Sequence, residues 1–413
     1  MSGNISAPES VSVPPSGARA DATPIAAPED AGRFLGGPAS AAALALTMFV
    51  EAVGYGVVAP TLPFLARDAG AGEAQIGFLV GLYAAVGLLV GIPFGALANR
   101  YGRRTLVLVG LGCLTLASFG FVLAPTYAWL VAARFVQGLG ATAIWVGSLT
   151  IAADLSPDSH MGRSLSWITG SWSLGFVVGP ALGGLGSVRF PFILYSLLSL
   201  AAFVVGCMAL PETGRPGART TLAGVVRVLR YPAVLASAAA TIALSFYYGA
   251  LEAFLPLFVD GLRVQRIGIG LLFAVAGLPS ILLPGAIGKL ADRIGDARVI
   301  LGGLIYAALV SALFLALAKV LPLWLLFLMM GLVEVLVYVP AVALLNRGMP
   351  RDERVFATAS HSYAFSGGFF LGPLIGGLLM PIGGYPLLFA TLAAANLAAI
   401  VCLLASRRRI DAH

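Results

Sequence analysis

Charged residues, cysteine and histidine are all scarce in this sequence. Only 10% of the 413 residues are Asp, Glu, Lys or Arg, whereas soluble domains carry about 25% charged residues. Hydrophobic residues make up 59% of the chain, and its mean hydropathy is +0.95. Because no soluble core could bury so much apolar surface, the composition predicts a membrane protein.

The few cysteines and histidines argue against most kinds of catalytic or metal site. Cys113, Cys207 and Cys402 lie singly within apolar runs and have no metal or redox spacing. The three histidines, at positions 160, 361 and 413, are equally scattered, so neither a metal centre nor a Ser/His/Asp hydrolase is indicated. We therefore expect a protein that is not an enzyme, holds no metal and needs no cofactor.

Basic residues outnumber acidic ones by 25 to 18. They sit in short clusters between apolar runs rather than on one broad surface, so we expect no nucleic-acid partner. Residues 1–38 are rich in Pro, Ser and Ala, and they lack the basic start, short apolar core and cleavage site of a signal peptide. This segment is predicted to be a disordered cytoplasmic tail.

Apolar runs bounded by Gly, Pro and charge predict twelve spanning helices, since one crossing takes about 20 apolar residues. In the first half they cover residues 40–66, 74–98, 105–124, 127–151, 163–187 and 190–211, and in the second half 233–260, 268–291, 297–318, 322–346, 354–380 and 384–405. The chain is thus predicted to comprise the tail at 1–38, a six-helix half at 39–211, a cytoplasmic linker at 212–232, a second six-helix half at 233–406, and a cytoplasmic tail at 407–413.

The distribution of Lys and Arg between alternate loops predicts the orientation of the chain. On the side that bears both termini and the linker lie 19 of the 25 basic residues, five lie on the other side, and Arg134 lies within a span. Short loops rich in positive charge stay in the cytoplasm, so both termini are predicted to be cytoplasmic. Arginine greatly outnumbers lysine, which suits a GC-rich bacterial source and hence a multi-pass protein of the cell membrane.

The two halves are copies of one unit. A shift of 193 residues aligns GALANRYG at 95–102 with GKLADRIG at 288–295, and GFVVGPALGG at 175–184 with GFFLGPLIGG at 368–377. Because six helices is an even number, both copies insert in the same orientation and form parallel repeats around an axis along the membrane normal. We expect the substrate site near the midplane, between the halves.

The Gly-Pro stretches belong to the fifth predicted helix of each half. Their glycines recur on one helix face and permit close approach of a neighbouring backbone, while the proline bends the helix. Tight packing is an alternative to a functional role, but in either case these helices are where the halves could meet. The residues concerned are Gly175, Gly179, Pro180, Gly183, Gly184, Gly368, Gly372, Pro373, Gly376 and Gly377.

The paired loops between the second and third helices of each half are predicted to form a cytoplasmic gate. Glycine and an amide or acidic residue suit a tight turn, and the arginines fix the cytoplasmic side. Asn99 and Asp292 could cap the next helix or pair with an arginine, in a contact that breaks when the halves rock. The gate residues are Gly95, Asn99, Arg100, Gly102, Arg103, Arg104, Asp292 and Arg293.

Three of these patterns resemble those of the major facilitator superfamily, and within it the twelve-helix drug:proton antiporters. The resemblance covers residues 40 to 405. The family's loop pattern G-x-x-x-D-R-x-G-R-R matches this chain at Gly95, Arg100, Gly102, Arg103 and Arg104. The family's helix 4 pattern R-x-x-Q-G-x-G matches at Arg134, Gln137, Gly138 and Gly140. The antiporters' helix 5 pattern G-x-x-x-G-P-x-x-G-G matches at Gly175 to Gly184. The resemblance implies an all-α membrane protein of two parallel six-helix repeats, working as a monomeric proton-coupled exporter.

The chain departs from the family at one position. The family's loop aspartate, taken there to form an ionic lock in the outward-facing state, is Asn99 here, while the second-half equivalent, Asp292, is retained. Asn99 can form hydrogen bonds but supplies no titratable charge, so a proton-sensitive lock is not expected in the first half.

Four ionisable residues lie within apolar spans, namely Glu51, Arg134, Glu252 and Glu334. Such residues usually face a water-filled cavity and mark an ion or substrate path, so we predict that they bind substrate and the coupling proton. The alternative is structural pairing, most obviously of Arg134 with Glu51, since helices 1 and 4 are neighbours in the family's fold. Placed between burial and that arginine, Glu51 could load and release a proton near neutral pH.

Polar and aromatic side chains at helical spacing from these charges predict the lining of the cavity. Each glutamate has a tyrosine four residues away on its own helix, and Arg134 shares a face with Gln137 and Trp145. The predicted lining residues are Tyr55, Gln137, Trp145, Tyr248 and Tyr338. Three glutamates against one arginine favour a cationic or zwitterionic substrate, with cation–π contacts to the aromatic rings, but an aliphatic, Gly-rich lining would suit lipids or neutral metabolites equally well.

Three functions follow from the sequence. The preferred one is proton-coupled export of a small amphipathic compound such as a drug, antibiotic or metabolite, by rocking of the halves across the lipid bilayer. A second is lipid or glycolipid translocation by the same fold. A third is a non-transporting membrane receptor or scaffold that binds partners through the tail or the linker.

Overall fold

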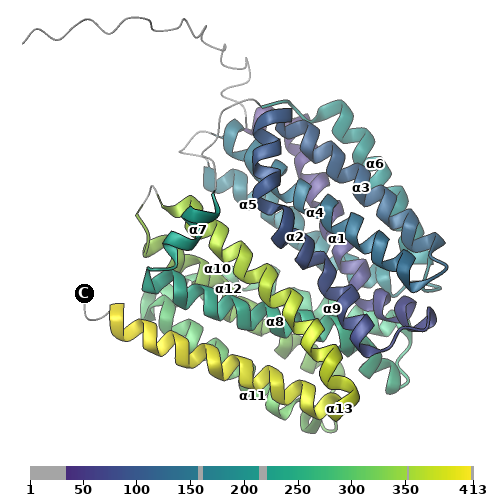
Figure 1. Ribbon diagram of the computed structural model, residues 1–413, viewed down its shortest axis with the longest axis vertical. Helices are drawn as coiled ribbons and strands as arrows, with labels where there is room; N and C mark the ends of the chain where they lie inside the picture. The colour runs from purple at the N-terminus through teal and green to yellow at the C-terminus, as the bar shows by residue number, and fades with distance from the viewer. Residues whose placement is uncertain (1–33, 157–160, 214–220, 351–352, 411–413) are drawn as a thin grey trace, which may run out of the picture.

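The computed structural model describes residues 34–156, 161–213, 221–350 and 353–410, and these ranges are helical without any strand. Figure 1 shows two packed bundles, α1 to α6 and α8 to α13, with the short helix α7 at one end. The elements are η1 (Phe34–Gly36), α1 (Pro38–Asp68), α2 (Glu73–Tyr101), α3 (Arg103–Leu123), α4 (Tyr127–Leu155), α5 (Met161–Gly183), α6 (Phe190–Ala209), α7 (Leu222–Val228), α8 (Pro232–Gly261), α9 (Arg266–Leu282), α10 (Pro284–Ile294), α11 (Asp296–Leu317), α12 (Leu323–Arg347) and α13 (Arg354–Ile410).

Single glycines connect several of these helices. Gly102 joins α2 to α3 and Gly295 joins α10 to α11, each with φ of 93°, a backbone conformation that favours glycine. The 57 residues of α13 would span about 85 Å as one straight helix, but the chain breaks at Gly384, where φ is 58° and ψ is −155°. The segment is therefore two membrane-length helices in sequence.

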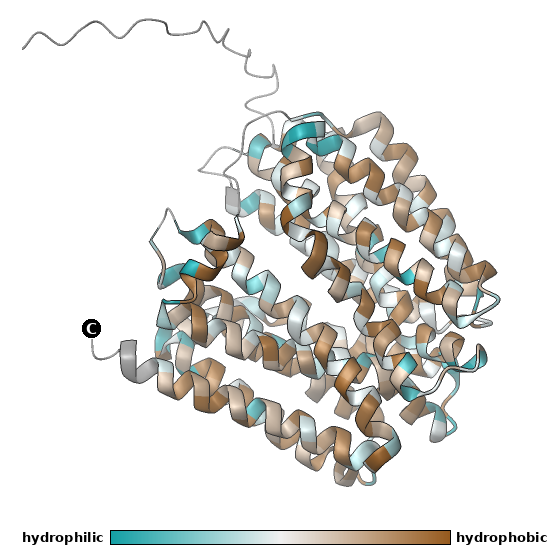
Figure 2. Cartoon of the chain, in the orientation of Figure 1, coloured by the Kyte–Doolittle hydropathy of each residue, from teal (hydrophilic) through white to brown (hydrophobic). Residues whose placement is uncertain are grey.

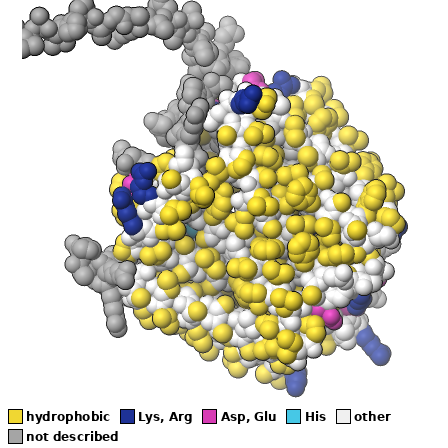
Figure 3. All heavy atoms as spheres, viewed as in Figure 1, with side chains coloured by type: hydrophobic (Ala, Val, Ile, Leu, Met, Phe, Trp, Pro, Cys, Tyr) yellow, Lys and Arg dark blue, Asp and Glu magenta, His cyan; other side chains and the backbone are white. Residues whose placement is uncertain are grey.

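Within the described ranges, nine helices are long and apolar enough to cross a membrane, or ten if the bent pair of α9 and α10 counts as one span. Apolar residues cover the bodies of the helices, and polar ones gather at their ends (Figure 2). In the space-filling view, an apolar belt separates two ends of the molecule that carry Lys and Arg (Figure 3). This is the surface of a multi-pass membrane protein, while the count of twelve spans stays a prediction.

Three boundaries differ from those that the sequence predicts. The predicted tail to residue 38 overlaps η1, and Leu35 is fully buried. Asn99 and Arg100 lie in the last turn of α2 rather than in a loop, because Gly102 alone makes the turn. The helix predicted at 268–291 bends by 50° before Pro284, which cannot donate a backbone hydrogen bond to α9.

The predicted linker at 212–232 contains α7, a helix that docks on the second half. Val228 is buried in a cluster with Val234, Leu345, Met349 and Ala357. We call the end of the molecule that carries α7 the linker face, and the end where α1 and α8 finish the far face.

The two halves meet through α2 against α13, α5 against α9, and α1 against α8. Gly77 of α2 lies against the carbonyl of Pro373, and Gly270 of α9 lies against the carbonyl of Pro180. Both members of each pair are 193 residues from their counterparts, so the interface repeats the internal symmetry. A side chain at either glycine would overlap the opposing backbone, which explains why a glycine is required there.

Contacts between the halves gather toward the far face. Figure 1 shows the bundles converging near α9 and diverging toward α7. The closest backbone approaches between the halves, at Gly77, Gly184, Gly270 and Gly377, all lie toward the far face. The halves are therefore closed on each other at the far face, and their helices diverge toward the linker face.

Candidate functional site

An ion pair and a hydrogen bond join the two halves at the centre of the molecule. Glu252 of α8 accepts a hydrogen bond from the Tyr55 hydroxyl of α1 at 2.7 Å through its Oε2. Its Oε1 lies 3.7 Å from Nη2 of Arg134 on α4, and the side chains of Arg134 and Glu252 are 0% and 6% exposed. Because buried charges need a partner, this pair holds α4 of the first half against α8 of the second.

The suggested pairing of Arg134 with Glu51 is wrong in this structure, since Arg134 pairs with Glu252. Glu51 accepts hydrogen bonds from the Tyr83 hydroxyl at 2.7 Å and from Trp172 Nε1 at 2.6 Å. These donors come from α2 and α5, so Glu51 is held entirely within the first half.

Gln137 orients the arginine rather than facing an open space. Arg134 donates from Nη1 to Gln137 Oε1 at 2.8 Å and from Nη2 to the Val80 carbonyl at 3.1 Å. The guanidinium also lies 4.9 Å from the centre of the Tyr83 ring. These groups all belong to the first half, and Glu252 is the contact that Arg134 makes with the second half.

Glu334 of α12 is the least satisfied of the three glutamates. Its Oε2 is shielded from solvent and has no hydrogen-bond partner among the described residues. Tyr248 and Tyr338 lie within electrostatic range of it, but the Tyr248 hydroxyl donates to the Met330 carbonyl at 3.2 Å. A carboxylate with one shielded oxygen that lacks a partner is a natural place for a proton or a cationic ligand.

Two of the tyrosines predicted to line the cavity contact residues of other helices. Tyr55 bonds to Glu252 of α8 rather than to Glu51 of its own helix, and Tyr338 packs its ring on His361 at 5.4 Å between centroids and on Phe365 at 6.4 Å. Helical spacing predicted the tyrosines near the glutamates, but it could not give these contacts.

Aromatic rings surround Tyr55 where the halves meet. Their centroids lie 5.7 Å from it for Tyr83, 6.4 Å for Trp172, 5.7 Å for Phe176 and 6.0 Å for Phe369. Phe369 comes from α13, so this shell also crosses between the halves. Trp145, predicted as a lining residue, packs against Trp172 at 5.7 Å.

The aromatic shell follows the internal repeat, whereas the charges do not. The pairs related by the 193-residue shift are Tyr55 and Tyr248, Trp145 and Tyr338, Trp172 and Phe365, and Phe176 and Phe369. The counterparts of the four ionisable residues are all apolar, namely Leu244, Phe327, Ala59 and Ala141. The repeat alignment is the signal that could have found Trp172, Phe176 and Phe369, which sequence reasoning missed.

At the linker face, each half carries an ion pair between equivalent helices, but with the signs exchanged. In the first half Arg103 at the start of α3 pairs with Asp154 near the end of α4. In the second half Arg347 at the end of α12 pairs with Asp296 at 3.3 Å and with Asp292. Arg103 and Asp296, and likewise Asp154 and Arg347, are 193 residues apart, so the first half forms its pair without an aspartate at position 99.

The remaining predicted gate residues do not form one cluster. Asn99 and Arg293 are exposed, Arg100 lies over the Tyr101 ring at 5.2 Å, and Arg104 donates to the Cys207 carbonyl at 2.5 Å. In this state, open at the linker face, these contacts stay within each half.

Most of the glycines in the Gly-Pro stretches pack within their own half, and two of them contact the other half. Gly175, Gly179 and Gly183 face α1 of their own half, as Gly368 and Gly372 face α8. Gly376 packs near Phe254 and Leu388. Gly184 and Gly377 instead lie against the other half, on α9 and α2.

At the far face, Arg67 and Asp260 form an exposed bridge between the halves. Arg67 Nη2 lies 3.1 Å from Asp260 Oδ2, and the two side chains are 50% and 37% exposed. They too are 193 residues apart, so the bridge joins the same position of the two repeats, which is Arg67 in the first half and Asp260 in the second. Arg67 and Arg266 also lie over the Phe64 ring, at 5.2 and 5.4 Å.

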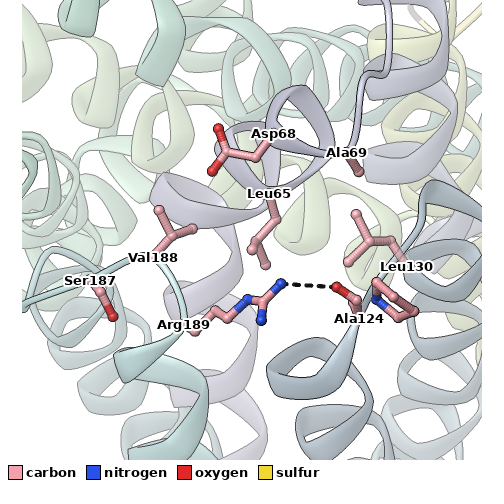
Figure 4. A pocket seen from close by; sticks show the side chains of 9 residues that line it. Leu65, Asp68, Ala69, Ala124, Leu130, Ser187, Val188 and Arg189 are labelled. Carbon is pink, nitrogen blue, oxygen red and sulfur yellow. Dashed lines mark hydrogen bonds between the residues drawn. The ribbon is translucent and has the colours of Figure 1, made fainter.

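A separate pocket of about 280 Å³ opens at the far face within the first half. Figure 4 shows its lining, with Arg189 donating to the Ala124 carbonyl at 3.1 Å and Asp68 and Leu65 on the opposite wall. It does not lie between the halves and contains none of the four intramembrane charges.

Comparison with known proteins gives consistent results. The family model described as Major Facilitator Superfamily matches residues 44–268 and 261–412. Multidrug resistance protein 1 of Bacillus subtilis (strain 168) is 26% identical over 379 residues, which cover 85% of this chain and 92% of that protein. Quinolone resistance protein NorA of Staphylococcus aureus is 26% identical over 172 residues, 41% of this chain and 44% of NorA.

Solved structures share the fold. The nucleoside transporter NupG has a TM-score of 0.76 at 13% identity, covering 89% of this chain and 99% of NupG. The human organic anion transporter MFSD10 has a TM-score of 0.65 at 18% identity, covering 88% of this chain and 99% of MFSD10. At such identities the likeness concerns the fold alone.

Proposed function

Since this chain belongs to the major facilitator superfamily, we propose that it exports a small amphipathic compound across the cell membrane in exchange for protons. Its relatives include proteins named for multidrug and quinolone resistance, which supports a drug-like substrate. The charge excess on the linker face supports a cytoplasmic position for that face and for both termini.

The observation that carries the proposal is the buried link of Arg134, Glu252 and Tyr55 across the halves. Protonation of Glu252 removes the charge that attracts Arg134, and the hold between the halves weakens. The halves can then rock more easily into the state in which the far face is open and the linker face is closed. A carboxylate that must be charged in one state and neutral in the other couples proton binding to the movement of the halves.

The aromatic shell supports a planar amphipathic substrate. Rings from both halves offer stacking surfaces, and Glu51 in the first half and Glu334 in the second supply carboxylates. Arg134 is engaged by Glu252, so the net charge offered to a ligand is negative. A cationic or zwitterionic aromatic compound fits these features.

Transport by purified protein in proteoliposomes tests this function. With a fluorescent quinolone as probe, an imposed pH gradient is expected to drive accumulation on the acidic side, and pyranine on that side should report the proton leaving it. A Glu252→Gln variant and a Glu51→Gln, Glu334→Gln double variant are each expected to lose most of the substrate-dependent proton flux. Unchanged proton flux in Glu252→Gln would overturn the coupling role of the link across the halves, and unchanged flux in the double variant would overturn that of Glu51 and Glu334.

A labelled-lipid assay on the same vesicles provides the contrasting result. Flipping of a fluorescent phospholipid with no quinolone movement at any pH gradient would overturn drug export and identify a lipid translocator instead.

A further inference from the structure

His361 is a buried basic residue of the second half to which the proposed cycle gives no role. It lies on α13, is 6% exposed, and faces α8 and α12. It is seven residues from Arg354, where α13 starts at the linker face, so it lies about 10 Å into the helix. Glu334, 13 residues from Arg347 at the end of α12, lies about 20 Å from the same face.

Two hydroxyls of α8 lie at Nδ1 of the imidazole. Ser237 Oγ lies 3.3 Å and Thr241 Oγ1 lies 3.2 Å from Nδ1. The Ser237 hydroxyl donates to the Ala341 carbonyl at 2.9 Å, so toward His361 it only accepts, whereas the Thr241 hydroxyl can donate or accept. In the tautomer that carries the proton on Nδ1 and so satisfies the Ser237 contact, Nε2 presents a lone pair.

That lone pair has no partner among the described residues. Nε2 is shielded from solvent and forms no hydrogen bond to any of them. If the residue served only to join α8 to α13, a side chain with a single polar group facing Ser237 and Thr241 would suffice and would leave no second buried nitrogen unpaired. The unpaired Nε2 is a base, and because burial disfavours the imidazolium, it can pass a proton on rather than keep it.

A path toward Nε2 begins at Glu334. Its Oε2 is also shielded and unpaired among the described residues, and Tyr338, one turn nearer the linker face on the same helix, packs its ring on His361 at 5.4 Å. Tyr338 is 39% exposed, so its side chain is not sealed within the core. The three side chains thus descend in order from the site toward the linker face.

Few other titratable groups lie near His361. From α8 it meets the hydroxyls of Ser237 and Thr241, and from α12 the ring of Tyr338, with Glu334 beyond it. Arg230 and Glu353, nearer the linker face, pair with each other at 3.2 Å.

We propose that His361 is the proton-transfer residue through which the second half releases the coupling proton to the linker face. The proton moves from the carboxylic acid of Glu334, through the Tyr338 hydroxyl or a water beside it, to the lone pair of Nε2. This step leaves a carboxylate and an imidazolium, and the imidazolium then gives up one proton to water at the linker face. The inference rests on the proposed proton-coupled function and adds a residue to it.

The test uses full-length protein in proteoliposomes with a fluorescent quinolone as probe. His361→Asn keeps an amide donor in place of Nδ1 but cannot carry a proton. We expect it to lose at least about tenfold in pH-driven transport while exchange of quinolone across vesicles at equal pH stays within about twofold of wild type. A protein damaged in its fold would lose both.

Chemical rescue gives a second, independent readout. His361→Ala leaves a space for a small base, so added imidazole is expected to restore part of the pH-driven rate in proportion to its concentration. Pyrrole has nearly the same shape but no basic nitrogen, and it should restore nothing.

Two outcomes overturn the inference while the proposed function stands. One is pH-driven transport by His361→Asn within twofold of wild type. The other is parallel loss of driven transport and exchange, with no rescue by imidazole, which assigns His361 a packing role. Absence of pH-driven transport in the wild-type protein would instead overturn the proposed function, and the inference with it.

Discussion

Replacement of Gly377 by alanine tests whether the contact between α13 and α2 belongs to one state of a rocking cycle. A methyl group at position 377 would lie 2.6 Å from the Glu73 carbonyl oxygen and 2.9 Å from Ala74 Cα. Both are backbone atoms of the opposite half and cannot turn aside as a flexible side chain could. The two helices would have to separate to admit the methyl group.

The size of the effect follows from the cost of overpacking. Extra carbon in a tightly packed interface costs about 1 to 3 kcal/mol, and here the cost falls only on the state in which α2 and α13 touch at the far face. The ratio of the far-face-open to the far-face-closed state should therefore rise by about 5-fold to about 150-fold. Alanine also favours the helix by up to about 1 kcal/mol over glycine, but equally in both states.

Spin-label distances between the halves measure this ratio. With the native cysteines replaced, labels at Asn99 and Asn346, both exposed near the linker face, report how far apart the halves lie there. Double electron–electron resonance is expected to show a shorter distance gaining population in Gly377→Ala. Gly184→Ala, whose methyl group would lie 2.8 Å from the Arg266 carbonyl oxygen, should act in the same direction.

Gly367→Ala is the matched control, because it lies on the same helix with no heavy atom within 4 Å of the added methyl group. It should leave the distances unchanged. Identical distributions for Gly377→Ala and Gly367→Ala would refute the reasoning, since the close contact would then not distinguish two states.

Two ion pairs give further predictions. Arg67→Ala should weaken far-face closure by about 0.2 to 1 kcal/mol, the contribution of an exposed ion pair, and the effect should fade in high salt. The same spin-label distances measure the change in closure. If an Arg67→Asp, Asp260→Arg exchange failed to restore closure, the bridge would be incidental. Asp154→Asn should destabilise the first half by about 3 kcal/mol, because it removes the Asp154 charge from its pair with the buried Arg103, and thermal unfolding in detergent reports this. An Arg103→Asp, Asp154→Arg exchange copies the polarity of the second half and should recover most of the lost stability, whereas no recovery would mean that the two halves are not interchangeable there.

Much of the architecture was determined by the sequence. Composition and spacing along the chain define the apolar runs, the 193-residue repeat and the Gly-Pro stretches. These features do not depend on how the helices pack. The same spacing located Glu51, Arg134, Glu252 and Glu334, since a charge in an apolar run is visible without a structure. It also indicated α5 and α13 as meeting places of the halves.

The tertiary structure decided the partners. Arg134 pairs with Glu252 rather than Glu51, Tyr55 bonds across the halves, and Glu51 is held by Tyr83 and Trp172. Such pairings depend on how far each helix is rotated about its axis and on which helix of the other half it touches. Both are set by packing between segments distant in the chain, so helical periodicity can place a side chain on a face but cannot say what stands opposite it.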